Sequence, residues 1–218
     1  MNKILVAPSI LSGDFANMGK TVSDLKMWGA DYAHVDVMDG VYVTNLTFGM
    51  PMVKALRRVT DMVLDVHLMI TKPERYVEEF VKSGADIVTF HPDASDDPGA
   101  TLKKIKAAGA KCGIVFNPDI DIDKYAHLFE MCDMILIMSV FAGYGGQKFI
   151  DYCLDRLKKV KAILDEKGLD IPIEIDGGIT EENVNAAIDA GATVIVAGSA
   201  VFKSEDPART IEILRGTK

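Results

Sequence analysis

Short apolar segments alternate with longer amphipathic segments along almost the whole chain. This alternation is typical of parallel strands that are covered by helices. Eight apolar segments rich in Ile, Val, Leu and Met have the length of strands: Ile4–Pro8, Tyr32–Met38, Met62–Met69, Ile87–His91, Lys111–Phe116, Met134–Ser139, Ile171–Asp176 and Thr193–Ala197. The pattern therefore predicts eight β/α units.

A repeated tetrapeptide with glycine at its second position separates helical segments from the strands that follow. It occurs as Trp28-Gly29-Ala30-Asp31, Ser83-Gly84-Ala85-Asp86, Ala108-Gly109-Ala110-Lys111 and Ala190-Gly191-Ala192-Thr193. Glycine takes the left-handed conformation that ends many helices, so each copy predicts a helix end. Capping residues predict helix starts at Asp14 or Ser23, at Pro73, and at Thr180 with Asn183 close behind.

Eight units with no signal for a second sheet favour a closed TIM (β/α)8 barrel. The 218 residues are close to the lower end of the length that such a barrel needs. No linker or shift in composition divides the chain, so we expect a single domain spanning residues 1–218. A Rossmann-like open sheet is the alternative fold.

Three of the predicted strands carry ionisable residues where buried parallel strands are normally apolar. His34, Asp36 and Met38 share one face of the second strand because side chains alternate along a strand. Asp65, His67 and Met69 repeat this in the third strand, and Glu174 and Asp176 end the seventh. All of them lie near the carboxyl ends of their strands, which form the catalytic face of a barrel.

Two imidazoles and two carboxylates at this face predict a divalent metal site, because His34, Asp36, His67 and Asp176 are typical ligands of zinc, iron, manganese or cobalt. The alternative is that each residue is a hydrogen-bonded core histidine or a capping aspartate. Burying so many ionisable groups without partners costs several kcal/mol each, which favours the metal site. Asp65 and Glu174 are expected to orient ligands from behind. Met38, Met69 and Met138 are either core residues or an apolar floor under the ligand.

Three glycine-containing loops follow the sixth, seventh and eighth predicted strands. They contain Gly143, Gly145 and Gly146, then Gly177 and Gly178, and finally Gly198 with Ser199. Exposed backbone N–H groups in such loops bind anions, and barrels often bind phosphate after their last strands. The loops therefore predict a phosphate site beside the metal, although tight turns also require glycine. His91 and His127 carry less signal: the first ends a strand, where it either lines the mouth or packs, and the second lies on a helical surface.

Composition restricts the class of partner. A net charge of −8 argues against nucleic acid, which requires a basic face. Three cysteines without CxxC spacing indicate neither disulfides nor a zinc ribbon, and they fit a reducing cytoplasm. The apolar run near the N-terminus is too short for a signal peptide, and no segment approaches the roughly 20 residues of a membrane span.

Several longer motifs resemble the ribulose-phosphate 3-epimerase family in the family's order and spacing. They are Ala7-Pro8-Ser9-Ile10-Leu11, His34-Val35-Asp36-Val37-Met38-Asp39-Gly40, Asn45-Leu46-Thr47-Phe48-Gly49, Asp65-Val66-His67-Leu68-Met69, Gly143-Tyr144-Gly145-Gly146-Gln147-Lys148-Phe149-Ile150, Asp176-Gly177-Gly178-Ile179 and Gly198-Ser199. The resemblance implies a homo-oligomeric isomerase of pentose phosphate metabolism, with one divalent metal ion per subunit and a sugar phosphate as substrate.

The resemblance also implies roles for individual residues. Asp36 and Asp176 are the acid–base pair on opposite faces of the substrate, and both join His34 and His67 in binding the metal. Substrate contacts are implied for Ser9, His67, Met38, Met69, Met138, Gly143, Gly145, Gly146, Gly177, Gly178, Gly198 and Ser199. Removing a proton next to a carbonyl and returning one from the other side would interconvert D-ribulose 5-phosphate and D-xylulose 5-phosphate.

Departures from the family pattern lie in loops. Residues 41–44, with Val41 and Thr44, replace the family's usual His-Phe-Val-Pro, and Phe141-Ala142 replaces an Asn-Pro or Asp-Pro pair. Residues 90–93 resemble the allulose-6-phosphate 3-epimerase branch, so a six-carbon ketose phosphate is the alternative substrate. The same ligand set would also serve metal-assisted hydrolysis, aldol cleavage, or sugar-phosphate binding without turnover.

Overall fold

The computed structural model describes residues 3–216, and eight parallel strands form its single sheet. The strands are β1 (Leu5–Ala7), β2 (Tyr32–Met38), β3 (Val63–Met69), β4 (Ile87–Phe90), β5 (Lys111–Phe116), β6 (Met134–Met138), β7 (Ile173–Asp176) and β8 (Val194–Val196). Each lies within its predicted segment, so the eight predicted strands are confirmed. The seventh begins two residues later than predicted, after Pro172, which has no N–H to donate to a neighbouring strand.

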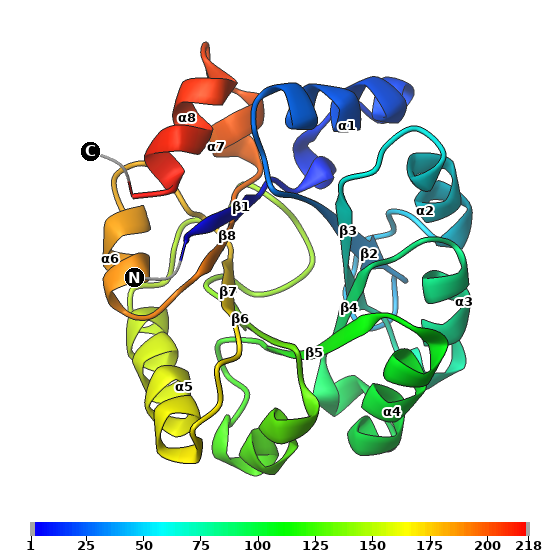
Figure 1. The fold of residues 1–218 in the computed structure, drawn as a ribbon, viewed down its shortest axis with the longest axis vertical. Coiled ribbons are helices and arrows are strands. Elements are labelled where there is room, and N and C mark those ends of the chain that lie inside the picture. Colours follow the sequence, from blue (N-terminus) through cyan, green and yellow to red (C-terminus); the bar gives the residue numbers. More distant parts are fainter. Residues whose placement is uncertain (1–2, 217–218) are drawn as a thin grey trace.

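The strands close into a barrel (Figure 1). Hydrogen bonding runs from β1 through β8 and then down in order to β2. The remaining seam between β1 and β2 is joined by a parallel bridge between Ser9 and His34, and by the Asp31 N–H, which donates to the Val6 carbonyl at 2.9 Å. The TIM (β/α)8 fold is therefore confirmed, and the open Rossmann-like sheet is wrong.

Helices surround the sheet (Figure 1). The α-helices are α1 (Met18–Met27), α2 (Met50–Arg57), α3 (Val77–Lys82), α4 (Pro98–Ala108), α5 (Cys153–Lys167), α6 (Val184–Asp189), α7 (Ser199–Phe202) and α8 (Pro207–Leu214). Short 3-10 helices span Ile10–Ser12, Phe15–Asn17, Pro73–Arg75 and Pro92–Ala94, and a longer one, Asp123–Met131, covers the β5–β6 connection.

The predicted helix ends are confirmed, because Gly29, Gly84, Gly109 and Gly191 all have positive φ. Of the two predicted starts for the first helical region, Ser23 is wrong, because it lies inside α1. Asp14 begins this region by capping the 3-10 helix that precedes α1; its side chain accepts the Ala16 N–H.

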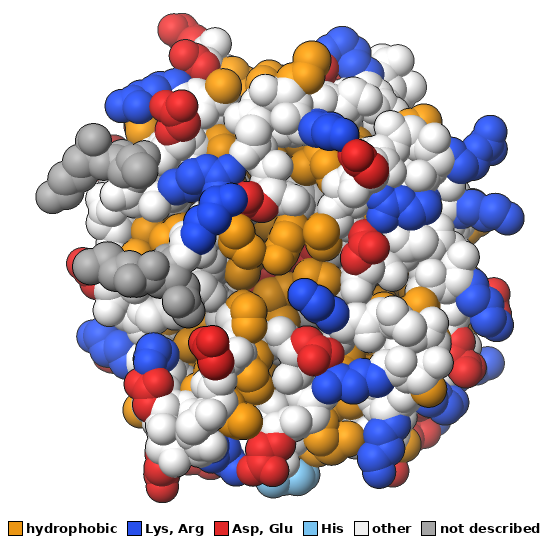
Figure 2. Space-filling model, viewed as in Figure 1, with side chains coloured by type: hydrophobic (Ala, Val, Ile, Leu, Met, Phe, Trp, Pro, Cys, Tyr) orange, Lys and Arg blue, Asp and Glu red, His pale blue; other side chains and the backbone are white. Residues whose placement is uncertain are grey.

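The barrel interior changes character along its axis. Near the amino ends of the strands it is apolar, with Ala7, Ile87, Met134, Val194 and Val196 packed together. Near the carboxyl ends it contains the buried ionisable residues of β2, β3 and β7. Apolar side chains also reach the surface at the centre of the face shown in Figure 2, where Lys, Arg, Asp and Glu side chains surround them.

None of the helices within residues 3–216 is long and apolar enough to cross a membrane. The predicted domain of residues 1–218 includes residues 1–2 and 217–218, which lie outside the described part, and this boundary stays a prediction.

Candidate active site

The four predicted metal ligands lie together at the carboxyl end of the barrel. His34 and Asp36 come from β2, His67 from the adjacent β3, and Asp176 from the end of β7. One possible ligand atom from each residue lies within 4.8 Å of those from the others. The strand register explains this, because β2 and β3 pair His34 with Asp65 and Asp36 with His67.

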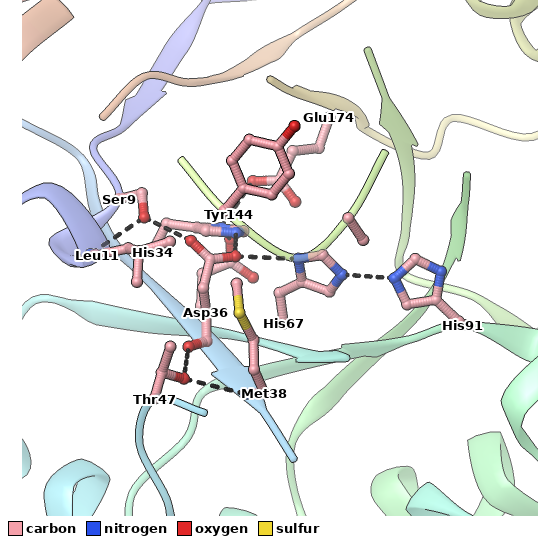
Figure 3. A network of polar contacts seen from close by, with 12 residues as sticks. Ser9, Leu11, His34, Asp36, Met38, Thr47, His67, His91, Tyr144 and Glu174 are labelled. Atoms are coloured by element: carbon pink, nitrogen blue, oxygen red, sulfur yellow. Dashed lines mark hydrogen bonds and ion pairs between the residues drawn. The ribbon is translucent and has the colours of Figure 1, made fainter. Parts of the chain in front are cut away.

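Asp36 is the hub of the hydrogen bonds in this cluster (Figure 3). Its Oδ2 accepts the Ser9 hydroxyl at 2.5 Å, and its Oδ1 lies 3.2 Å from His67 Nδ1. Thr47 fixes the backbone beneath it, donating to the Asp36 carbonyl at 2.6 Å and accepting the Met38 N–H at 3.0 Å. The sequence pattern indicated no role for Thr47 beyond its place in a family motif.

Asp65 and Glu174 lie behind His34, as expected. His34 Nδ1 is 2.6 Å from Asp65 Oδ2 and 3.7 Å from Glu174 Oε1. Glu174 and Asp65 are fully buried, and within residues 3–216 neither oxygen of Glu174 has a hydrogen-bond partner. A carboxylate that accepts the Nδ1 proton of a histidine directs the Nε2 lone pair of that histidine toward a metal.

The two candidate acid–base residues differ in proton affinity. Burial raises the pKa of Asp176 to about 7, and the Asp36 carboxylate adds to this effect. Burial also acts to raise the pKa of Asp36, but His34 and His67 outweigh it and hold that pKa well below the ordinary value. Burial lowers the pKa of His34 as well, yet Asp36 and Asp65 raise it well above 6.5 overall.

The residues present fit a divalent metal. His34 Nε2 is buried within the cluster, 3.4 Å from Asp36 Oδ1, and makes no hydrogen bond to any described residue. An unpartnered imidazole nitrogen facing carboxylates has the chemistry of a ligand, since a bound cation satisfies such atoms and neutralises the carboxylates. The structure thus contains a His/Asp cluster suited to a metal ion.

An open cavity of about 580 Å³ lies over this cluster and contains nearly all predicted substrate-contacting residues. Asp36 and Asp176 form part of its wall. The remaining predicted residues in its lining are Ser9, Met38, Met69, Met138, Gly143, Gly145, Gly146, Gly177, Gly178, Gly198 and Ser199. The exception is His67, which is fully buried behind the wall, and its contact with substrate stays a prediction.

The methionines combine the two roles that the sequence left open. Met38, Met69 and Met138 are 1–4% exposed, so they are core residues, and they also line the cavity. They supply an apolar surface beside the carboxylates, with no polar groups that compete for a bound ligand.

The glycine loops bring backbone close to the cavity. A Cβ at Gly178 would lie 2.5 Å from the Phe149 backbone nitrogen, and one at Gly198 would lie 2.5 Å from Ser12 Oγ. Within residues 3–216 no Lys or Arg lines the cavity. Backbone N–H groups and hydroxyls are therefore the groups available to hold an anion there.

The segments that depart from the family pattern contact each other at the cavity rim. The Tyr42 hydroxyl donates to Asp93 Oδ2 at 3.2 Å and accepts from Asn117 Nδ2 at 3.2 Å. Asn117 Oδ1 accepts the Ala142 N–H at 3.1 Å. Val41, by contrast, is 75% exposed.

His91 carries little signal in the sequence, yet it lies against a predicted ligand. Its Nε2 is 2.9 Å from His67 Nε2, and the residue is fully buried. Sequence offers no signal for this contact beyond the position of His91 at a strand end. His127 is exposed, as expected.

Comparisons with known proteins agree with this geometry. Residues 5–202 match the model of the ribulose-phosphate 3 epimerase family. The ribulose-phosphate 3-epimerase of Bacillus subtilis is 47% identical over 99% of this chain and 100% of its own, and that of Synechocystis is 46% identical over 99% and 94%. A solved 3-hexulose-6-phosphate synthase shares the fold, with a TM-score of 0.68 at 19% identity over 99% of both chains.

Proposed function

Because the chain belongs to the ribulose-phosphate 3 epimerase family, we propose that it interconverts D-ribulose 5-phosphate and D-xylulose 5-phosphate. The observation that carries the proposal is the placement of Asp36 and Asp176 in one cavity wall, on strands that β8 and β1 separate around the barrel. Two carboxylates from different sides of a cavity meet the need of an epimerase, which removes a proton from one face of a carbon and returns one to the other.

Asp36 and Asp176 exchange roles with the direction of the reaction. One carboxylate removes the proton from carbon 3, and the other, in its protonated form, donates a proton to the opposite face of the planar enediolate. Ser9 orients Asp36 through its hydrogen bond to Oδ2. The methionine floor contacts the planar carbons without competing polar groups, and the glycine loops hold the phosphate.

His34, Asp36, His67 and Asp176 would hold one divalent ion per subunit, either zinc, iron, manganese or cobalt. When bound, the ion acts as a Lewis acid on the carbonyl oxygen next to carbon 3. Metal analysis of the purified protein by inductively coupled plasma mass spectrometry identifies the ion and its stoichiometry.

The test of the reaction is proton exchange at carbon 3. Incubation with D-ribulose 5-phosphate in D2O should yield xylulose 5-phosphate with deuterium at carbon 3, detected by NMR. Asp36→Asn should abolish this exchange, and the exposed Asp61→Asn serves as a matched control that retains it. Near-normal exchange in Asp36→Asn would overturn the two-base assignment.

The relatives favour the five-carbon sugar, because they are named ribulose-phosphate 3-epimerases, and they do not favour allulose 6-phosphate. Relative kcat/KM on ribulose 5-phosphate and allulose 6-phosphate measures this preference. Hydrolysis or aldol cleavage would instead break a bond without exchange at carbon 3, and a pure binding protein would show no turnover.

A homo-oligomer in the cytoplasm completes the proposal. Exposed apolar side chains at one rim of the barrel support self-association: Val41 and Leu46 are at least 73% exposed, and Leu46 pairs with Asp39 in a bridge beside Val41. Phe15, also exposed, stacks on Phe48 at 4.9 Å, two residues after Leu46. Light scattering on the wild type and on Leu46→Glu tests the assembly. Three free, buried cysteines support a reducing compartment.

A further inference from the structure

His91 connects to the ligand cluster only through His67. It follows β4, its side chain is fully buried, and its Nε2 lies 2.9 Å from His67 Nε2 (Figure 3). Among the described residues, His91 belongs to neither of the two clusters that present possible metal ligands. The opposite ring nitrogen of His67, Nδ1, faces Asp36 at 3.2 Å. His67 therefore lies between the ligand cluster and His91.

The short distance between the two rings restricts their protons. A neutral imidazole has one N–H and one acceptor nitrogen. At 2.9 Å one proton must lie between the two Nε2 atoms, because two N–H groups or two lone pairs would repel. In one arrangement His91 donates to His67, which donates from Nδ1 to Asp36. In the other, His67 donates from Nε2 to His91 and its Nδ1 carries a lone pair toward the cluster.

We propose that His91 is a positioning residue for metal binding, accepting the Nε2–H of His67 and thereby directing the Nδ1 lone pair of His67 toward the ion. The proposal rests on the metal site of the proposed function. Only this second arrangement leaves a ligand atom on His67. His91 is free to adopt it because its own Nδ1 has no partner among the described residues, so no other hydrogen bond determines its tautomer.

Tyr42 encloses His91 from the loop side. Its ring lies 4.8 Å from the His91 ring between centroids, and its hydroxyl is held by Asp93 and Asn117. Tyr42 belongs to residues 41–44, which depart from the family pattern, and it is absent from the described lining of the cavity. This segment thus packs against the support of a ligand rather than against the sugar.

The direct test is the tautomer of each ring. The chain has four histidines, so selective 15N labelling gives a simple long-range 1H–15N spectrum. In chelator we expect His67 protonated on Nδ1 and His91 on Nε2. With Zn2+, His67 should carry its proton on Nε2 and His91 on Nδ1, while the exposed His127 stays unchanged. An unchanged His91 tautomer on Zn2+ binding would overturn the proposal.

Variants test the same point through affinity. His91→Phe keeps an aromatic ring but has no acceptor, and we expect its Zn2+ dissociation constant, measured by chelator competition, to rise about 10- to 100-fold. His91→Gln retains an acceptor and should recover most of this loss, which a purely space-filling role would not predict. Wild-type affinity in His91→Phe would overturn the proposal. A normal tautomer change without epimerisation would instead refute only the proposed function.

Discussion

Aspartates occupy both ends of the barrel, and the two ends use them differently. At the carboxyl end, Asp36 and Asp176 are part of a cavity wall, beside a histidine nitrogen without a hydrogen-bond partner and two such oxygens on Glu174. At the amino end, the aspartates that precede β2, β4 and β6 each accept a backbone N–H from the neighbouring β/α unit. Unmet hydrogen-bonding capacity therefore marks the end that binds ligands, and met capacity marks the end that stabilises the fold.

The amino-end contacts form a ring with one member before each even-numbered strand. Each member uses a side-chain oxygen to accept the N–H of the preceding strand: Asp31 from Val6 at 2.9 Å, Asp86 from Leu64 at 2.8 Å, Asp133 from Cys112 at 3.0 Å and Thr193 from Ile173 at 3.1 Å. The backbone N–H of each member returns a bond to the carbonyl of the same partner residue, at 2.7–3.0 Å. The ring thus couples the strands in pairs.

Asp176→Asn should give the largest effect and should separate the two ends most clearly. We expect kcat to fall by about 10²- to 10⁴-fold because the amide cannot take up or donate the proton. Unfolding stability in chelator should be unchanged or higher, since a buried carboxylate beside Asp36 is removed. Steady-state kinetics and urea unfolding measure the two effects. A variant that loses stability but retains turnover would reverse the comparison.

Asp31→Ala should show the opposite behaviour. It leaves the Val6 N–H without its acceptor and removes the partner of Lys3 and Arg215, so we expect a loss of about 1–3 kcal/mol in unfolding free energy. The kcat at 25 °C should stay unchanged. Asp61→Ala, whose ion pair with Lys26 is exposed, is the control and should cost less than about 1 kcal/mol.

Thr193→Val tests the neutral member of the ring. The substitution preserves shape but removes the acceptor of the Ile173 N–H, and we expect a loss of about 0.5–1.5 kcal/mol. This loss should not vary between pH 7 and pH 3, because no charge is involved. A strong pH dependence in urea unfolding would contradict this assignment.

Acid should weaken the Asp31 contact by a fraction of the effect of Asp31→Ala. Burial acts to raise the pKa of Asp31, but the Val6 N–H, Lys3 and Arg215 outweigh it and hold the pKa below 3.8 in the folded protein. Its contribution is therefore fully present above the unfolded pKa and is lost as the pH falls through the folded pKa. The difference in urea stability between wild type and Asp31→Asn should shrink below about pH 4. A difference that stays constant to pH 3 would exclude this ionisation as the cause.

Much of the active end was predictable because two simple periodicities act there. Side chains alternate along a strand, which places His34 and Asp36 on one face, and strand ends of a barrel converge, which brings in His67 and Asp176. The glycine loops were predictable for the same reason. His91 was not, because its contact with His67 depends on the register between β3 and β4.

The amino-end ring shows the same limit. The glycine tetrapeptides predicted four helix ends, but nothing in their pattern indicated a role for Asp31, Asp86 or Thr193 at their last positions. Asp133 lies outside any such tetrapeptide, and Lys111 occupies the last position of the copy before β5. Local sequence therefore did not indicate which residues would accept hydrogen bonds from a neighbouring strand.

The metal-ligand cluster was thus determined by the sequence itself, because strand alternation and strand order act on every copy of such a pattern. Tertiary structure decided what lies behind and around that cluster. The tautomer partner of His67, the Tyr42 contacts that link the altered loops, and the hydrogen-bonded ring at the amino end all depend on distances between residues far apart in the chain. Such distances arise only when the barrel closes, since hydrogen bonds form over about 3 Å and periodicity does not specify them.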